Sequence, residues 1–173
     1  MSDNLAGILT ETAAAHGDHT AFKLDDVELT YAVLEGSAAR IATLLAARGL
    51  DPGDRVGLML PNVPYFPAIY YGILRAGGVV VPMNVLLKER EARFYLEDSG
   101  ARILLAWHDF AEAAESGASA AGAEALLVKP GEFESLVAEH EPQVAPVDRD
   151  GQDTAVILYT SGTTGKPKGA ELT

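Results

Sequence analysis

The sequence predicts an α/β fold in which helices flank a mainly parallel sheet, and three observations support this prediction. Short apolar segments of strand length alternate with longer segments of helical periodicity between residues 31 and 138. The stretch "TAVILYT", residues 154–160, carries no charge, which is typical of a strand buried on both faces of a parallel sheet. The 173 residues are also enough to bury the core of one ordinary domain.

The first elements along the chain are a predicted hairpin and a predicted helix. Residues 20–31, "TAFKLDDVELTY", alternate apolar and polar side chains around an acidic pair, which indicates two strands joined by a short turn. Thr30 then has the side chain and position of a helix N-cap. Apolar residues recur on one face over residues 31–48, and Gly49 follows as the expected left-handed stop.

Strand and helix patterns keep alternating after this helix. The expected elements are "RVGLML" as a strand, a helix from Asn62 and Pro64 to about Ala76, "VVVP" as a strand, "KEREARFYLEDSG" as a helix closed by Gly100, "RILLAW" and "EALLVK" as strands, and "GEFESLVAEH" as a short helix. Residues 109–123 are rich in alanine and serine and have little to bury. That segment is expected to be either a solvated helix or a tolerant loop.

The domain organisation follows from one change in composition. Residues 141–153, "EPQVAPVDRDGQD", combine two prolines with mixed charge, which is typical of a linker. We therefore expect an N-terminal α/β subdomain over 1–140, a linker over 141–153, and the start of a next segment over 154–173. That last segment contains the apolar strand and a glycine-threonine loop.

Composition excludes several classes of function. The chain has 13 Lys plus Arg against 25 Asp plus Glu, and a net charge of −12 disfavours nucleic-acid binding. It has no cysteine, so disulfides and thiolate metal sites are excluded. Arg75, two glycines and Pro82 interrupt the apolar stretch 65–87, so we read it as a buried helix, a turn and a strand and expect no transmembrane segment. A cytoplasmic location is expected.

The glycine-threonine loop has the chemistry of an anion-binding site. Glycines let the backbone turn tightly and present N–H groups, hydroxyl groups add donors, and lysines add positive charge. The residues assigned to cofactor binding are Thr160, Ser161, Gly162, Thr163, Thr164, Gly165, Lys166 and Lys168. Gly169 is expected to contribute to the same backbone nest, and Pro167 fixes one backbone angle between the lysines.

Two other interpretations of the loop fit less well. A flexible linker requires neither an apolar strand immediately before it nor two lysines without nearby acids. The nucleotide-binding loop G-x-x-x-x-G-K-[ST] requires a longer glycine spacing and a hydroxyl residue after the lysine, whereas Pro167 follows Lys166 here. The four histidines show no metal spacing, so no metal ligand and no catalytic residue are assigned.

The stretch "YTSGTTGKPKG" resembles the phosphate loop of the adenylate-forming superfamily, which includes acyl-CoA and aryl-CoA synthetases, luciferases and adenylation domains of peptide synthetases. "LTYAVL" at 29–34 and "LRAGGVVVPMN" at 74–84 resemble two earlier signatures in the expected order. The resemblance covers roughly residues 20–173. "PMN" and the helix after it are more similar to acyl-CoA ligases, with the fatty-acid branch preferred and aryl acids such as coumarate or benzoate as the alternative.

The resemblance implies a two-step ligase reaction of lipid metabolism with ATP, Mg²⁺ and CoA. A carboxylate attacks the α-phosphate of ATP to give acyl-adenylate and pyrophosphate, and the CoA thiol then displaces AMP. The loop is expected to hold the β- and γ-phosphates through Thr163, Thr164 and the backbone of Gly162 and Gly165. Lys168 would pair with the leaving pyrophosphate, while Ser161 and Lys166 would only shape or solvate the loop.

The resemblance also implies that other parts of such an enzyme lie beyond Thr173, including the adenine pocket, the magnesium-binding acid and the catalytic lysine. We therefore expect the chain to be an N-terminal fragment that is inactive alone. Its exposed apolar surface would favour self-association or a swapped dimer. A natural short paralogue remains the alternative, either as a phosphate-binding module or as a noncatalytic docking partner, and a stop codon after residue 173 would favour it.

Overall fold

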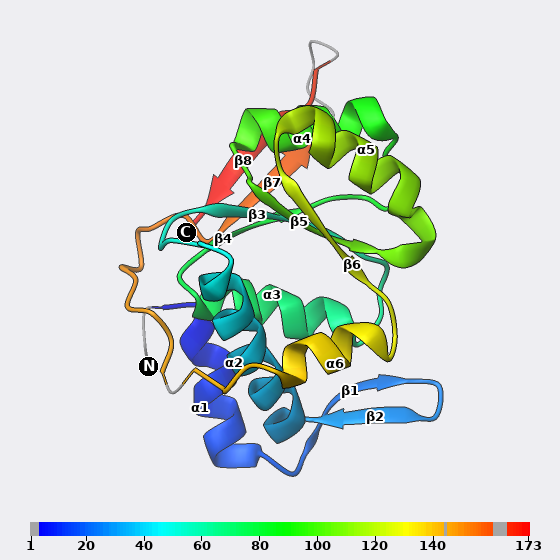
Figure 1. Cartoon of the computed structure of the whole chain (residues 1–173). Coiled ribbons are helices and arrows are strands. Elements are labelled where there is room, and N and C mark those ends of the chain that lie inside the picture. Colours follow the sequence, from blue (N-terminus) through cyan, green and yellow to red (C-terminus); the bar gives the residue numbers. More distant parts are fainter. Residues whose placement is uncertain (1–3, 144, 161–165) are drawn as a thin grey trace.

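The computed structural model describes residues 4–143, 145–160 and 166–173. Helices cover both faces of one six-stranded sheet, and a separate two-stranded hairpin projects from one end of the molecule (Figure 1). The strands lie in the order β6-β5-β3-β4-β7-β8. Their bounds are β3 Arg55–Met59, β4 Val79–Pro82, β5 Ile103–Trp107, β6 Glu124–Val128, β7 Val156–Thr160 and β8 Lys168–Leu172. All neighbouring pairs are parallel except β7 and β8, which confirms the predicted fold class.

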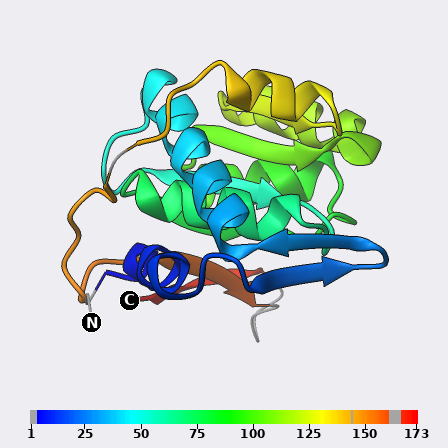
Figure 2. The same ribbon diagram turned by 90° about the horizontal axis from the view of Figure 1, so that it is seen from below.

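The helices divide into two groups, one for each face of the sheet (Figures 1 and 2). One group comprises α1 (Ala6–His16), α2 (Tyr31–Ala47), α3 (Tyr65–Arg75) and α6 (Glu132–Ala138). The other comprises α4 (Glu89–Ser99) and α5 (Ala111–Ala121), with a short 3-10 turn, His108–Phe110, before α5. Successive strand residues point to opposite faces. Leu58 therefore packs with the first group and Met59 with the second.

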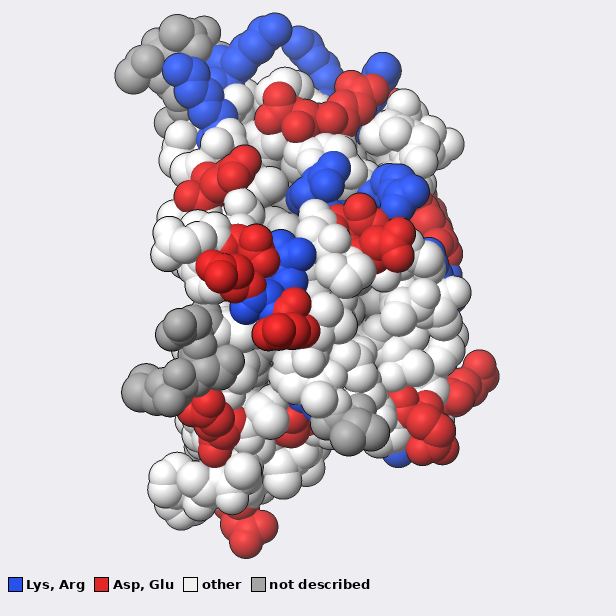
Figure 3. Space-filling view, turned by 90° about the vertical axis from the view of Figure 1, so that its left-hand side faces the viewer, with Lys and Arg blue, Asp and Glu red and all other residues white. Residues whose placement is uncertain are grey.

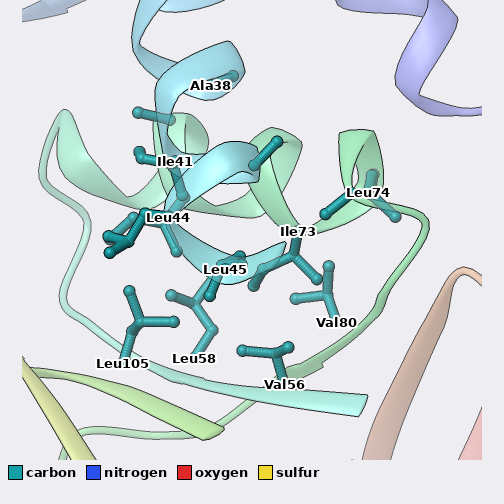
Figure 4. Packing of buried hydrophobic residues seen from close by; sticks show 14 of the residues in the cluster. Ala38, Ile41, Leu44, Leu45, Val56, Leu58, Ile73, Leu74, Val80 and Leu105 are labelled. Atoms are coloured by element: carbon teal, nitrogen blue, oxygen red, sulfur yellow. The ribbon is translucent and has the colours of Figure 1, made fainter. Parts of the chain in front are cut away.

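The larger core lies between α2, α3 and the sheet (Figure 4). Leu45 of α2 and Ile73 of α3 are fully buried against Val56 and Leu58 of β3. Helix α2 begins as predicted, because the Thr30 hydroxyl accepts a hydrogen bond from the Val33 amide at 3.3 Å. Burial of this apolar face fixes α2 and α3 as a rigid support for one side of the sheet.

The hairpin of β1 (Thr20–Leu24) and β2 (Val27–Thr30) is antiparallel, as predicted. Asp25 in its turn has a φ of 50°, a left-handed conformation that aspartate tolerates in tight turns. Residues 65–87 fold as α3, a glycine turn and β4, as predicted, although α3 begins at Tyr65 and Asn62 does not cap it. Among the described residues, no helix combines the length and the apolar character needed to cross a bilayer.

Residues 109–123 correct one expectation. Most of them form α5, which is neither a loop nor a wholly solvated helix, because Ala114, Gly117 and Ala118 are buried. A Cβ atom on Gly117 would lie 2.8 Å from the Cβ of Ala92 in α4. Small side chains therefore serve close helix packing, which composition alone does not reveal.

The segment predicted as a linker runs along α2 and α3 and forms specific hydrogen bonds with them. The Gln143 amide donates to the Ala39 carbonyl at 3.0 Å, and the Val147 amide donates to the Arg75 carbonyl at 2.8 Å. The buried guanidinium of Arg75 donates in turn to the Gln143 carbonyl at 2.8 Å. The segment is thus tied to the α/β unit, and the division at residues 141–153 stays a prediction.

The prediction that β7 is buried on both faces is wrong. Val156 is buried, but Leu158 is 41% exposed and Thr160 is exposed. Ile157 and Tyr159 pack beside the core under α4, whereas Val156 and Leu158 point to the opposite face of the strand, which is covered at Val156 and exposed at Leu158. An uncharged apolar run therefore forms a strand covered mainly on one side.

Candidate phosphate-binding site

The candidate site is the connection between β7 and β8. These antiparallel strands place Thr160 directly opposite Lys168 and Tyr159 opposite Gly169. The sequence pattern predicts a loop at residues 168–172 and does not predict β8. The hairpin thus sets a threonine and a lysine side by side at the base of the loop, and both residues are exposed.

The loop lies where ligands commonly bind in α/β folds. β7 runs parallel to β4, and the loop follows the carboxyl end of β7. Figure 1 shows this end of the hairpin beside α4 at the top of the molecule. The loop therefore follows the carboxyl end of a parallel strand, as expected.

Part of the predicted residue set lies outside the described residues, namely Ser161, Gly162, Thr163, Thr164 and Gly165. Their assignment to phosphate binding stays a prediction. Thr160, Lys166 and Lys168 are described: Thr160 ends β7, Lys168 begins β8, and Lys166 lies two residues before β8. A phosphate chain held between them would meet donors from two sides.

Gly169 has a different place from the one expected. It lies within β8 and not in the turn. A Cβ atom there would lie 2.8 Å from Ile157 Cγ2 and 3.3 Å from the Tyr159 ring. The absence of a side chain therefore leaves room for Tyr159 to lie over its cross-strand partner.

Tyr159 connects the hairpin to α4. Its hydroxyl donates to Asp98 Oδ2 at 2.7 Å. Its ring stacks on Tyr95 with centroids 4.2 Å apart and planes at 25°, and it meets Phe94 edge-on at 6.3 Å. Sequence reasoning gave these residues no role, although the three-residue spacing of Tyr95 and Asp98 places them on one face of the predicted helix.

Both phenol groups of this contact are neutral at physiological pH. Burial, followed by the hydrogen bond to the Asp98 carboxylate, raises the pKa of Tyr159 well above its usual value. Burial and the nearby Glu91 carboxylate also raise the pKa of Tyr95. Tyr159 therefore acts as a stable hydrogen-bond donor to Asp98.

The charges around the loop differ from those of the whole chain. Lys166 lines a surface hollow together with three basic residues of the α4 region, Lys88, Arg90 and Arg93. Glu91 and Glu97 lie in the same hollow, and Glu97 pairs with Arg93 at 2.8 Å. Figure 3 shows basic and acidic side chains next to one another at this end of the molecule.

Lys166 and Lys168 take part in none of the ion pairs between described residues. Their charges are therefore not neutralised by a described carboxylate, which favours binding of an anion. Across residues 4–143, 145–160 and 166–173, no group of three or more His, Asp or Glu side chains is arranged to hold a metal ion. We assign no metal ligand to these residues.

Comparison with known families gives a match over nearly the whole chain. Residues 9–173 match the family described as "AMP-binding enzyme". A feruloyl-CoA synthase of Amycolatopsis sp is 41% identical over 154 residues, which cover 89% of this chain and 30% of the relative. A long-chain-fatty-acid–CoA ligase of Mycobacterium tuberculosis is 35% identical over 147 residues, which cover 83% of this chain and 29% of the relative.

The fold agrees with solved structures of similar enzymes. A benzoate CoA ligase from Burkholderia xenovorans LB400 superposes with a TM-score of 0.89 at 28% sequence identity. The match covers 98% of this chain and 34% of that structure. The chain thus spans about a third of the length of the proteins it matches.

Proposed function

Because the chain belongs to the AMP-binding enzyme family, we propose that it supplies the phosphate-binding hairpin of an adenylate-forming acid–CoA ligase. The observation that carries this proposal is the register of β7 and β8, which sets Thr160 opposite Lys168 at the carboxyl end of a parallel strand. The loop between these two residues is rich in glycines and hydroxyl residues, and Lys166 and Lys168 follow it. That set of donors suits the β- and γ-phosphates of ATP.

The proposed reaction begins when a carboxylate oxygen of the acid attacks the α-phosphorus of ATP. The bond from that phosphorus to the β-phosphate oxygen breaks, pyrophosphate leaves, and the thiol of CoA later displaces AMP. Negative charge grows on the departing oxygen, and each donor aimed at such charge contributes about 3 kcal/mol in comparable sites. Lys168 and the loop hydroxyls would serve this purpose, while Mg²⁺ accompanies ATP as part of the substrate.

For the acid, we propose a fatty acid, with an aromatic acid as the second candidate. The helix after "PMN" and the similarity to a long-chain-fatty-acid–CoA ligase favour the first. The similarity to a feruloyl-CoA synthase and to a benzoate CoA ligase favours the second. A panel of fatty and aromatic acids, tested with a full-length protein that carries this sequence, distinguishes them by thioester formation.

The 173 residues alone are proposed not to catalyse thioester formation, since they span about a third of the length of the matched relatives. Purified chain incubated with ATP, Mg²⁺, CoA and the acid panel should release no AMP above a blank. AMP release above the blank would contradict this part of the proposal.

The phosphate-binding role is tested directly on the chain by calorimetric titration with tripolyphosphate. We expect binding that weakens at least tenfold in the double variant Lys168→Ala with Thr164→Ala, because two of the proposed contacts are removed. Lys129→Ala is the matched control, because it removes an exposed lysine just after β6 at the opposite edge of the sheet. Equal affinity of the double variant and the wild type would remove the loop from the proposed function.

A further inference from the structure

We propose that Asp98 and Tyr95 of α4 are positioning residues for Thr160, at the base of the phosphate loop, and that they act through Tyr159. The inference rests on the proposed function, because it concerns the same loop. It adds two residues that lie outside the loop sequence and that would not touch the nucleotide.

The sheet itself holds the loop-bearing end of β7 weakly. Between the described residues of β4 and β7, the parallel register consists of the single pair Val80↔Val156, at the first residue of β7. The other neighbour of β7 is β8, whose residues are all exposed. Thr160, four residues after Val156, therefore lies at the end of a hairpin that the sheet anchors only at its base.

Tyr159 provides the missing anchor one residue before Thr160. Its ring lies between Gly169 on β8 and Tyr95 on α4, and the Asp98 carboxylate accepts its hydroxyl proton at 2.7 Å. Adjacent Cα atoms are about 3.8 Å apart, so fixing Tyr159 also restricts where Thr160 lies.

Helix α4 is a rigid platform for this anchor. Ala92 and Leu96 are buried at 0% and 1% exposure against the sheet and α5, which fixes the opposite face of the helix. The Ser99 hydroxyl donates to the Tyr95 carbonyl at 2.6 Å, close to the end of the helix. The position of Tyr159 is thus set by the packed body of the protein, and preorganised donors bind a charged ligand better than mobile ones do.

An electrostatic role and a positioning role of Asp98 predict opposite changes in tripolyphosphate affinity when Asp98 is removed. A carboxylate near the loop repels an anion, so its removal should strengthen tripolyphosphate binding if charge alone matters. If Asp98 positions the loop through Tyr159, its removal should weaken binding instead. Asparagine separates the two effects, because it removes the charge but keeps an oxygen that accepts the tyrosine hydrogen bond.

The test is calorimetric titration of the whole chain with tripolyphosphate, combined with thermal melting of every variant. We expect Asp98→Ala and Tyr159→Phe to weaken binding about fivefold to tenfold, because Thr160 loses its anchor and must then be ordered when the ligand binds. Asp98→Asn should bind as tightly as the wild type or more tightly. Glu97→Ala is the charge control, since it removes a neighbouring carboxylate that does not contact Tyr159, and it should not weaken binding.

Three results would overturn the inference while leaving the proposed function intact. The first is that Asp98→Ala binds tripolyphosphate as tightly as the wild type or more tightly. The second is that Asp98→Asn and Asp98→Ala lose the same amount of affinity. The third is that the loss of affinity across the variants only follows the loss of melting temperature. Failure of the wild-type chain to bind tripolyphosphate is a different outcome. It would overturn the proposed function itself, and the inference with it.

Discussion

At the scale of single residues, the roles of two glycines depend on what faces them. Gly169 opposes Tyr159 and has no room for a side chain, since a Cβ atom would lie 2.8 Å from Ile157. Gly36 in α2 has no atom within 4 Å of the same position. One glycine is thus required by packing, and the other is not.

Gly169→Ala should lower the free energy of unfolding by about 1–3 kcal/mol, the usual result of forcing a methyl group into a packed site. Gly36→Ala should instead raise it by up to about 1 kcal/mol, because alanine favours a helix interior over glycine. Urea denaturation of both variants checks this pair. An unchanged free energy of unfolding in Gly169→Ala would contradict the close packing of Tyr159 over β8.

Arg75 is a second residue whose role comes from its surroundings. It is only 4% exposed, forms an ion pair with Glu35, and donates to the Thr10 hydroxyl at 3.1 Å. Removing this carboxylate takes an ion-pair partner away from a buried positive charge, and breaking such buried pairs costs about 3–5 kcal/mol.

Glu35→Ala should therefore lower the free energy of unfolding by about 3 kcal/mol, measured by urea denaturation. The exposed pair Lys23–Glu28 supplies the control, because Glu28→Ala should change stability by less than about 1 kcal/mol. Similar small losses in both variants would show that Arg75 does not depend on Glu35.

The sequence indicated the residue types at the site but not their fixed positions. Glycines, hydroxyls and lysines in one short run are sufficient to predict an anion-binding loop. The contact of Tyr159 with Asp98 joins residues 61 positions apart, and no local pattern specifies which helix face meets which strand. The strand position of Gly169 was missed for the same reason, since it depends on the pairing of β7 with β8.

At the scale of elements, local signals predicted most helices and strands because caps, glycine stops and apolar periodicity act within a few residues. Thr30 begins α2, and Gly100, with a φ of 69°, follows the end of α4, as expected. Burial was harder to predict. The apolar run in β7 suggested two covered faces, and the small residues of α5 suggested none, because burial depends on the neighbours of an element.

One hydrogen bond between elements gives a prediction about pH. Tyr65 at the start of α3 donates to Glu134 of α6. Burial and then this carboxylate raise the pKa of Tyr65 to about 12 from a usual 10.0. The folded state favours the neutral phenol, so its contribution to stability is complete below pH 10 and is lost as the pH rises towards 12.

Tyr65→Phe should therefore flatten the decline in stability between pH 10 and pH 12, measured by urea denaturation at several pH values. Tyr31→Phe is a suitable control, because it removes another phenol from the same side of the sheet without breaking the Tyr65–Glu134 hydrogen bond. An identical alkaline slope in wild type and Tyr65→Phe would contradict the link between α3 and α6.

At the scale of the whole molecule, apolar side chains are exposed on the open face of the β7–β8 hairpin. Leu158 is 41% exposed and Leu172 is 44% exposed, and cross-strand pairing sets both on one face with Val156 and Ala170. β8 is also an edge strand, whose free backbone groups favour pairing with another strand. This surface supports the expectation of self-association.

Sedimentation of the chain should accordingly show concentration-dependent association that Leu158→Lys with Leu172→Lys reduces, because charge on an edge sheet opposes pairing. Leu86→Lys is the control, since it alters an exposed leucine, 70% accessible, that lies before α4 and outside the hairpin. A monomer at every concentration would contradict this expectation.

The central claim is that the β7–β8 hairpin holds the phosphate chain of a nucleotide. The most direct measurement is the change in backbone amide resonances of the isotope-labelled chain on addition of tripolyphosphate and, separately, of MgATP. The largest changes should fall on residues 160–168, with Lys168 among them, and should saturate with both ligands. Saturable changes confined to other parts of the sheet or to the β1–β2 hairpin, with residues 160–168 unaffected, would contradict the claim.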